Sequence, residues 1–458
     1  MSKLHVLTLA SLFLISVGIS CGPSGQGDID NPANATLQAV SSTQTPAELF
    51  SYLSPSIPFL STPLSTGSGI LIDGGYVLTN YHVVSPYQSA RIVFPDGSEF
   101  LNVPLVVGDS LRDIAVLGPI DIDLPVPPVA SVEDLSVGSP VLLIGYPGEP
   151  DSFPQPTLST GLISRIREWD SGGVTYIQTD QAIAGGQSGG ALLSMDGQII
   201  GVSGLGFSEV SYALTASIHD VMIQVEELFE RKNASQPTFR TQNFGQPPTR
   251  SDILLLDDDW QQQVYLIEEV VDSQIDISVS SRNDIYFDVI DSIGEYYAEV
   301  DEYETGEEFA SFIVDYPGPI YASIYQFGYD EAAVEINCNC DLNLLADIDD
   351  FHTLSDGEFY FGEIDFPGDA DTYSIDLKSG EAIELFVTSV AIDAYVYFSG
   401  LGNPEGLEIS DDDSGGGLYG LDAKANFVAP YSGEFRFMVS DASGWNSTGG
   451  YLVKIESR

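Results

Sequence analysis

Residues 66–84, TGSGILIDGGYVLTNYHVV, contain the pattern on which the fold depends. Two short apolar runs flank Asp-Gly-Gly, and turn residues between such runs indicate two strands joined by a tight turn. The same pattern recurs in RIVFPDGSEF (91–100), VLLIGYPG (141–148), GGVTYIQTD (172–180) and ALLSMDGQIIGVSG (191–204). Short strands at regular spacing predict an all-β barrel or sandwich between Ser65 and Ser217.

One helix interrupts this pattern at residues 217–232, SIHDVMIQVEELFERK. Its apolar residues follow helical spacing, and Ser217 stands where an N-cap is expected. They are Ile218, Val221, Met222, Val225, Leu228 and Phe229. The helix therefore closes a first domain, for which we predict residues 46–235.

Length and charge limit the remaining possibilities. The chain has 458 residues, 43% of them apolar, which predicts two to four globular domains. Its formal net charge is -53. Phosphate backbones need a basic surface, so nucleic acid is not an expected partner.

The N-terminus, MSKLHVLTLASLFLISVGISCG, reads as an export signal over residues 1–21, because a short apolar stretch follows Lys3 and ends at small residues. GISC at 18–21 resembles a bacterial lipobox, although Gly18 replaces the usual Leu. The resemblance implies lipidation of Cys21 and anchoring to a membrane. Secretion with an incidental cysteine is the alternative. Residues 22–45 lack periodicity and predict a flexible linker.

The C-terminal half follows a second linker, 236–250, and carries most of the charge. Residues 236–458 hold 8 bases and 45 acids (8 - 45 gives -37). DSQIDISVSSRNDIYFDVID (272–291) aligns with GEAIELFVTSVAIDAYVYFS (380–399), and 309–336 aligns with 425–455. These repeats of alternating strands predict two β-sandwiches, 251–340 and 341–458. The second resembles bacterial pre-peptidase C-terminal domains, which accompany secreted peptidases, and the first is a degenerate match.

GGQSGG at 185–190 surrounds one serine with glycines that would weaken a strand. The hexapeptide is either a tight turn or a loop that exposes Ser188 as a nucleophile. A serine nucleophile needs a base and an acid that orients the base. Of the four histidines, only His82 lies between the N-terminal signal and the closing helix. A histidine in such a place is also commonly a satisfied core or turn residue.

Three segments together resemble the chymotrypsin-fold serine peptidases of the HtrA type: TGSGILIDGGYVLTNYHVV, VVGDSLRDIAVL and QTDQAIAGGQSGGALLSMDGQIIGV. The resemblance covers roughly residues 60–230 and implies a double β-barrel that hydrolyses peptide bonds. It implies His82 as general base, Ser188 as nucleophile and Asp113 as the orienting acid. Asp109 is the rival acid, and it could instead cap a turn.

The same resemblance implies an oxyanion hole formed by the amides of Gly186 and Ser188. Gln187 replaces the aspartate that switches trypsin-like zymogens, so we expect the loop to be ordered intrinsically or by substrate. No PDZ domain is evident. Ala182, and the segment Ser203, Gly204 and Leu205, are the expected walls of the specificity pocket. Their small, uncharged nature predicts cleavage after small or aliphatic residues.

Two further features bear on ligands. Cys338 and Cys340 are either a strained local disulfide or two free thiols, and two cysteines alone do not make a metal site. Asp411, Asp412 and Asp413 are either a solvated acidic turn or ligands for Ca²⁺. The catalytic chemistry itself calls for no metal and no cofactor.

Two other function classes compete with an exported serine endopeptidase that acts on proteins or peptides. One is an inactive extracellular binding or adhesion protein on a peptidase scaffold. The other is a structural surface protein that uses its charge for colloidal stability.

Overall fold

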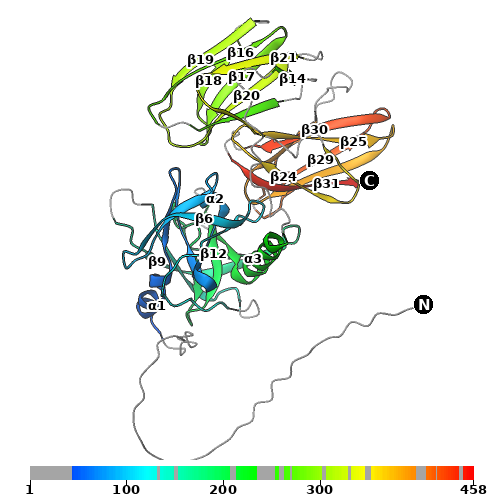
Figure 1. Cartoon of the computed structure of the whole chain (residues 1–458). Helices are drawn as coiled ribbons and strands as arrows, with labels where there is room; N and C mark the ends of the chain where they lie inside the picture. Colours follow the sequence, from blue (N-terminus) through cyan, green and yellow to red (C-terminus); the bar gives the residue numbers. More distant parts are fainter. Residues whose placement is uncertain are drawn as a thin grey trace, which may run out of the picture. The chain divides into compact units, whose positions relative to one another are not determined.

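The computed structural model describes residues 44–458 apart from 131–134, 149–152, 207–212, 235–252, 257–261, 269–270, 302–305, 328–331, 346–351, 399–408, 419 and 443–446. The predicted export signal, with Cys21, therefore lies outside the described residues. The prediction of an all-β chain with a chymotrypsin-like fold and additional β modules is confirmed, and Figure 1 traces the strands of each module.

We call the part of the chain from Pro46 to Asn233 the peptidase-like module. Its first half is an antiparallel sheet in the order β2-β1-β5-β6-β7-β4-β3. Leu60 near one edge and Leu71 at the other belong to the same buried core, so the sheet curls around its apolar face. Each such buried aliphatic side chain contributes about 1.5–3 kcal/mol. The strands are β1 Phe59–Ser61, β2 Thr66–Ser68, β3 Ile70–Ile72, β4 Tyr76–Thr79, β5 Ser89–Val93, β6 Glu99–Asp109 and β7 Ile114–Leu117.

The second half is a closed antiparallel barrel in the order β10-β13-β12-β11-β8-β9. The Met195–Gly197 turn joins β11 to β12, as the Asp-Gly pair in the sequence predicts. The strands are β8 Pro140–Gly145, β9 Thr157–Trp169, β10 Val174–Thr179, β11 Ala191–Ser194, β12 Ile199–Gly206 and β13 Ala213–Ser217.

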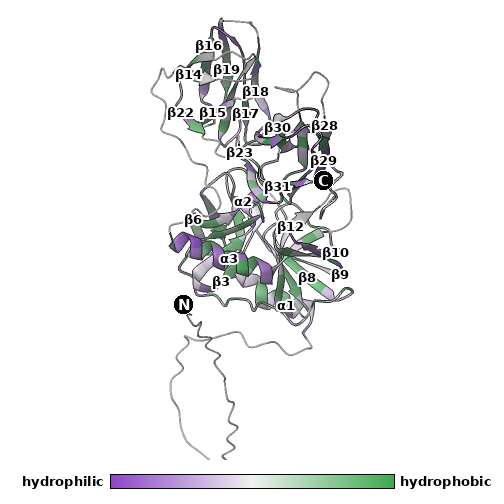
Figure 2. Ribbon diagram, turned by 90° about the vertical axis from the view of Figure 1, so that its right-hand side faces the viewer, coloured by the Kyte–Doolittle hydropathy of each residue, from purple (hydrophilic) through white to green (hydrophobic). Residues whose placement is uncertain are grey.

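Three helices accompany these sheets: α1 Pro46–Leu53, α2 Tyr81–Val84 and α3 Ile218–Asn233. The α3 helix confirms the sequence prediction, and Figure 2 shows polar and apolar residues alternating around it. Ser217 occupies the N-cap position but its side chain makes no capping hydrogen bond. The helix α1 begins with a capping box between Thr45 and Glu48 and is a feature that the apolar periodicity of the sequence does not predict. In the described part of the chain no helix has the length and apolarity needed to span a membrane.

The first β-sandwich stacks the sheets β14-β21-β16-β19 and β18-β17-β20-β15-β22 over a common core. Cys338 and Cys340 form a disulfide at the end of β21, with their Cα atoms 5.1 Å apart. The strands are β14 Ile253–Leu256, β15 Gln262–Ile267, β16 Gln274–Ser281, β17 Asp284–Asp291, β18 Tyr296–Val300, β19 Gly306–Ile313, β20 Ile320–Phe327, β21 Ala332–Cys338 and β22 Leu342–Leu345.

The second β-sandwich has the sheets β24-β31-β26-β29 and β23-β25-β30-β27-β28. Apart from the edge strands β22 and β23, this order repeats that of the first sandwich strand for strand, in agreement with the internal repeat in the sequence. The strands are β23 His352–Thr353, β24 Phe359–Ile364, β25 Ala370–Leu377, β26 Ala382–Ser389, β27 Ala394–Phe398, β28 Ile409–Asp411, β29 Ala423–Val428, β30 Gly433–Asp441 and β31 Gly449–Ser457.

The second sandwich shares a buried cluster with the peptidase-like module. Leu418 and Leu452 pack in the same apolar cluster as Trp169 at the end of β9. Within this contact the indole Nε1 of Trp169 donates a buried hydrogen bond of 3.0 Å to the hydroxyl of Thr388. An unpaired indole N–H would be costly there, so this bond fixes the orientation of both side chains.

We expect Thr388→Val to destabilise the full chain by about 1–3 kcal/mol, because it leaves the buried N–H of Trp169 without its acceptor. The same hydroxyl also bonds to Asp422, which adds to the loss. Denaturant unfolding of the full chain measures the effect. Thr388→Ser keeps the hydroxyl and is the matched control, and equal unfolding midpoints for the two variants would contradict the assignment.

Candidate active site

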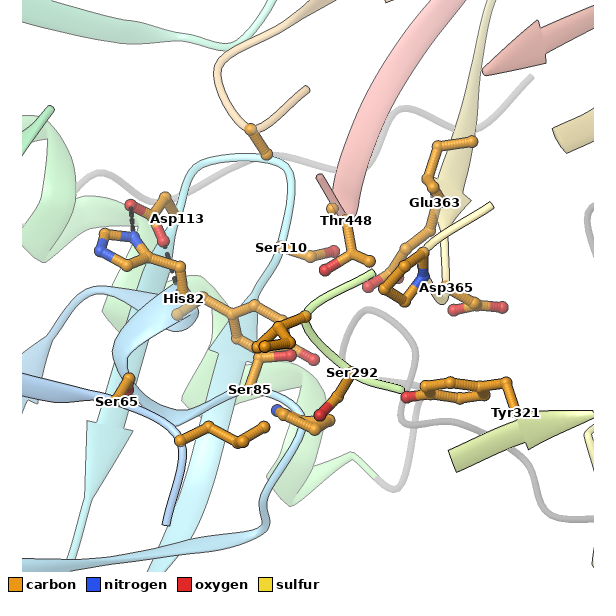
Figure 3. Close-up of a pocket in the computed structure, with 18 of the residues that line it drawn as sticks. Ser65, His82, Ser85, Ser110, Asp113, Ser292, Tyr321, Glu363, Asp365 and Thr448 are labelled. Atoms are coloured by element: carbon orange, nitrogen blue, oxygen red, sulfur yellow. Dashed lines mark hydrogen bonds and ion pairs between the residues drawn. The ribbon is translucent and has the colours of Figure 1, made fainter. Parts of the chain in front are cut away.

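His82 and Asp113 are brought together where two neighbouring strands end. His82 lies in α2, directly after β4, and Asp113 directly precedes β7, which pairs with β4. The ring Nδ1 of His82 lies 2.8 Å from Oδ2 of Asp113, and the backbone amide of His82 donates to Oδ1 at 2.9 Å (Figure 3). A carboxylate only accepts, so Nδ1 carries the proton and Nε2 of the neutral ring is an acceptor.

The backbone around Asp113 is specialised for this contact. Asp113 has a positive φ of 56°, which aspartate adopts more readily than most residues. The side-chain amide of Asn80 donates to the carbonyl oxygen of Asp113 at 3.0 Å and helps to hold this conformation. The rival acid, Asp109, is 1% exposed and pairs with Arg112 at 2.7 Å, so Asp113 is the one that contacts His82.

Opposing effects act on the pKa of His82. Burial lowers this pKa, whereas the negative charge of Asp113 and its hydrogen bond to Nδ1 raise it. The net result is a pKa above the ordinary histidine value of 6.5. On acidification, the ring thus gains a proton at a higher pH than an isolated histidine. Once Nε2 is protonated, it can no longer accept a hydrogen bond.

The GGQSGG loop, 185–190, runs between β10 and β11. Gly186 and Gly189 have φ of 88° and 81°, values that side-chain-bearing residues rarely adopt. A Cβ on Gly189 would lie 2.0 Å from the carbonyl oxygen of Ser68, so the loop must approach β2 as bare backbone. The amide of Ser68 in turn donates to the carbonyl of Ser188 at 2.7 Å. These contacts confine Ser188 to one place beside β2.

Gln187 holds the same loop from inside. Its Oε1 accepts from the amide of Ala184 at 2.8 Å, and its Nε2 donates to the hydroxyl of Thr157 at 3.3 Å. The side chain is 5% exposed. Sequence analysis noted only the missing zymogen aspartate at this position. A buried amide in a glycine-rich turn was the signal that could have identified the structural role.

The hydroxyl of Ser188 donates to the carbonyl oxygen of Gly204 at 3.2 Å, and it makes no hydrogen bond with His82 in this structure. The carbonyl of Gly185 accepts from the amide of Gly148 at 2.7 Å, so the trans peptide directs the Gly186 N–H the opposite way. Among the described residues, neither this N–H nor that of Ser188 donates to another backbone group. Both amides are therefore available to an incoming acceptor.

We call the cavity of about 270 Å³ beside these groups the catalytic pocket. Apart from His82 and Asp113 its walls are uncharged. They comprise Ile183, Ala184, Gly185, Ser188, Gly204, Val390, Ala391 and Thr448.

Of the predicted substrate-binding residues, Gly204 lines this pocket. Ser203 is fully buried in β12, and Leu205 of β12 is the register partner of Leu214 on the neighbouring strand β13. Ala182 is exposed and does not line the cavity, whereas its neighbour Ile183 does. The assignment of Ala182, Ser203, Gly204 and Leu205 to a specificity pocket stays a prediction.

In the part of the chain that the structure describes, no group of three or more His, Cys, Asp or Glu side chains is arranged to hold a metal ion. Asp411 accepts hydrogen bonds from the amides of Ser414 and Lys424 through Oδ2 at 3.0 and 2.6 Å, as a turn-stabilising carboxylate does. Binding of Ca²⁺ at Asp411–Asp413 stays a prediction.

Comparison with known proteins gives a family for one region. Residues 67–202 match the trypsin-like peptidase domain, and this range includes His82, Asp113 and Ser188. The chain is 40% identical over 143 residues to a probable periplasmic serine endoprotease, DegP-like, of Halomonas elongata, with 30% of this chain and 29% of that protein covered. It is 33% identical over 193 residues to the serine protease Do-like HtrA of Bacillus subtilis, with coverage of 38% and 42%.

Solved structures give similar matches. A serine endoprotease from Yersinia pestis is 26% identical, with a TM-score of 0.37 and coverage of 42% of this chain and 68% of that one. An HtrA-type protease with tripeptide is also 26% identical, with a TM-score of 0.38 and coverage of 46% and 69%. The chain spans less than half of the length of the two curated relatives above. Residues 67–202 are thus similar to trypsin-like peptidase domains.

The geometry predicts how His82 titrates. We expect its Cε1–H resonance, followed by NMR against pH, to report a pKa above 6.5, and we expect Asp113→Asn to lower that pKa. The substitution removes the charge that raises the pKa and leaves the burial that lowers it. Asp109→Asn, in the same turn but bonded to Arg112, is the control with little effect. A pKa unchanged by Asp113→Asn would contradict the assigned pairing.

Proposed function

We propose that this chain is an exported serine endopeptidase in which Ser188 is the nucleophile, His82 the general base and Asp113 the acid that orients the base. One observation carries the proposal. The carboxylate of Asp113 holds both the ring and the backbone amide of His82, in the same pocket as Ser188 and beside two available amides. A turn with no catalytic role would not need this combination of groups.

In the first step, the Oγ of Ser188 forms a bond to the carbonyl carbon of the substrate while its proton passes to Nε2 of His82. This step requires the hydroxyl to rotate from the carbonyl of Gly204 toward the ring. Such a change of rotamer is fast, and catalytic hydrogen bonds are often unformed before substrate binds. The charge of Asp113 stabilises the resulting imidazolium.

Negative charge then develops on the substrate oxygen. The amides of Gly186 and Ser188 are the donors we assign to it, each typically worth about 3–4 kcal/mol in the transition state. The C–N bond breaks as His82 returns the proton to the leaving amine, which leaves an acyl group on Ser188. Water repeats the sequence, with His82 as base, and releases the acid product.

The catalytic pocket supports a preference for small or aliphatic residues before the cleaved bond. Ile183 and Ala184 give it an apolar wall, and no charged side chain other than His82 and Asp113 lines it. A lysine or arginine side chain would lose hydration there without gaining a carboxylate partner beyond the one engaged by His82.

A second candidate function is an inactive binding or adhesion protein on a peptidase scaffold. The observation that favours it is the hydrogen bond from Ser188 to the carbonyl of Gly204 in place of one to His82. We favour the peptidase because His82 and Ser188 line the same pocket, whereas an inactive scaffold has no need of the Asp113–His82 pair.

We further infer that the chain acts outside the cytoplasm on protein or peptide substrates. The export signal at 1–21 and the periplasmic DegP-like relatives support this location. Lipidation of Cys21, with membrane anchoring, remains our proposal over simple secretion. The net charge of -53 argues against nucleic acid as a partner. The shared strand order of the two sandwiches supports assigning both to the pre-peptidase C-terminal class.

Covalent labelling tests the assignment of the nucleophile. We expect a fluorophosphonate probe to label the wild-type chain at Ser188, and Ser188→Ala and His82→Ala to abolish peptide cleavage. Asp113→Asn should lower kcat by on the order of 10⁴-fold, because the ring loses its correct tautomer. Serine-to-alanine substitution at Ser194, in β11, is the control with wild-type labelling. A wild-type chain that neither reacts with the probe nor cleaves peptides would establish the binding-protein alternative.

A peptide library varied at the residue before the cleaved bond tests the pocket. We expect kcat/KM to be higher for Val, Ala or Leu than for Arg or Lys, since the pocket offers apolar contacts and no free carboxylate. Ile183→Asp should reverse the order by adding a negative charge at the wall. A wild-type preference for Arg would refute the specificity argument while leaving the catalytic assignment intact.

A further inference from the structure

The catalytic pocket is not made by the peptidase-like module alone. Val390, Ala391 and Thr448 line it together with His82 and Ser188, and these three belong to the second β-sandwich. Val390 and Ala391 lie between β26 and β27, and Thr448 directly precedes β31. Two loops in the C-terminal part of the chain thus line the same pocket as His82 and Ser188, although they are distant from both residues in sequence.

A second cavity of about 250 Å³ adjoins the catalytic pocket. Figure 3 shows it with His82 and Asp113 toward one end and Glu363, Asp365 and Tyr321 toward the other. Four of the residues that the structure describes line both cavities: His82, Asp113, Ala391 and Thr448. Ala391 and Thr448 therefore stand at the junction, beside the histidine of the triad.

The sandwich is anchored on both sides of this junction. On the barrel side, Trp169 bonds to Thr388 at 3.0 Å, two residues before Val390. On the other side, a Cβ on Gly450 would lie 2.7 Å from the amide nitrogen of Leu111, in the turn that leads to Asp113. This close backbone approach and the shared apolar cluster fix the loops against the domain that carries the triad.

The loops border the site without filling it. The catalytic pocket keeps a volume of about 270 Å³, and 47% of the His82 side chain remains exposed. That volume approaches the lower limit of ordinary ligand pockets, about 300 Å³. An inhibitory segment bound in the active site would occupy this space. The geometry therefore favours loops that border the substrate site over loops that block it.

Resting on the proposed function, we propose that the second β-sandwich forms one wall of the substrate cleft, in which Ala391 and Thr448 contact the peptide on either side of the cleaved bond. An endopeptidase must hold residues on both sides of that bond, and the two adjoining cavities provide room on both. The sandwich then determines specificity, and it must stay attached to the active enzyme.

A large side chain at the junction tests this wall in the full chain. We expect Ala391→Trp to lower kcat/KM, by about tenfold or more, for an internally quenched peptide that spans both sides of the bond. The rate at which a small fluorophosphonate labels Ser188 should stay close to that of the wild type, because the probe needs only the triad. Thr448→Trp, at the second contact, should give the same divergence.

Ala382→Trp is the matched control, because Ala382 lies at the opposite end of β26, roughly 25 Å from the junction at about 3.3 Å per residue. Thermal unfolding shows whether each variant is folded. If Ala391→Trp does not fold, Thr448→Trp provides the test in its place. Wild-type peptide cleavage in a folded junction variant overturns the proposal. Equal loss of labelling and cleavage also overturns it, because the triad itself would then be disturbed. A wild-type chain without labelling defeats the proposed function instead.

Discussion

The double hydrogen bond from His82 to the carboxylate of Asp113 is the constraint on which the rest of the site depends. One oxygen accepts from the ring and the other from the backbone amide, so the ring is fixed both in direction and in tautomer. The positive φ of Asp113 places local strain at this point, and the hydrogen bond from Asn80 offsets part of it. Strain of this kind persists only where neighbouring contacts determine the geometry.

The loop that carries Ser188 is under a different constraint, because it has to expose two amides while its backbone stays fixed. Gly186 and Gly189 supply conformations that other residues avoid, and they alone would make the loop flexible. The buried side chain of Gln187 provides the rigidity, because it ties the amide of Ala184 to the hydroxyl of Thr157. The hydrogen bonds that hold this loop thus come from within the chain.

Local periodicity predicted the fold class and the helix α3, whereas the resemblance of three segments to a known family indicated His82, Asp113 and Ser188, which line one pocket. Neither signal predicted α1, which is short and has no long apolar repeat. Ile183, which lines the catalytic pocket next to the predicted Ala182, was not singled out, because a sequence does not show which side chain of a turn points inward. Ala391 could not be found at all, because contacts between modules leave no periodic signal.

The attachment of acidic sandwiches to this peptidase domain has a physical consequence. If the modules were only tethers, their charge would act at long range and be screened beyond about 8–10 Å at physiological salt. Trp169 and Thr388 instead meet in a buried contact, and the loops at Ala391 and Thr448 border the same pocket as His82. If these loops form the proposed wall of the cleft, recognition of substrate depends on short-range packing, which salt screens little. We therefore expect salt to change the association rate of charged substrates strongly. The preference for the residue before the cleaved bond should change much less.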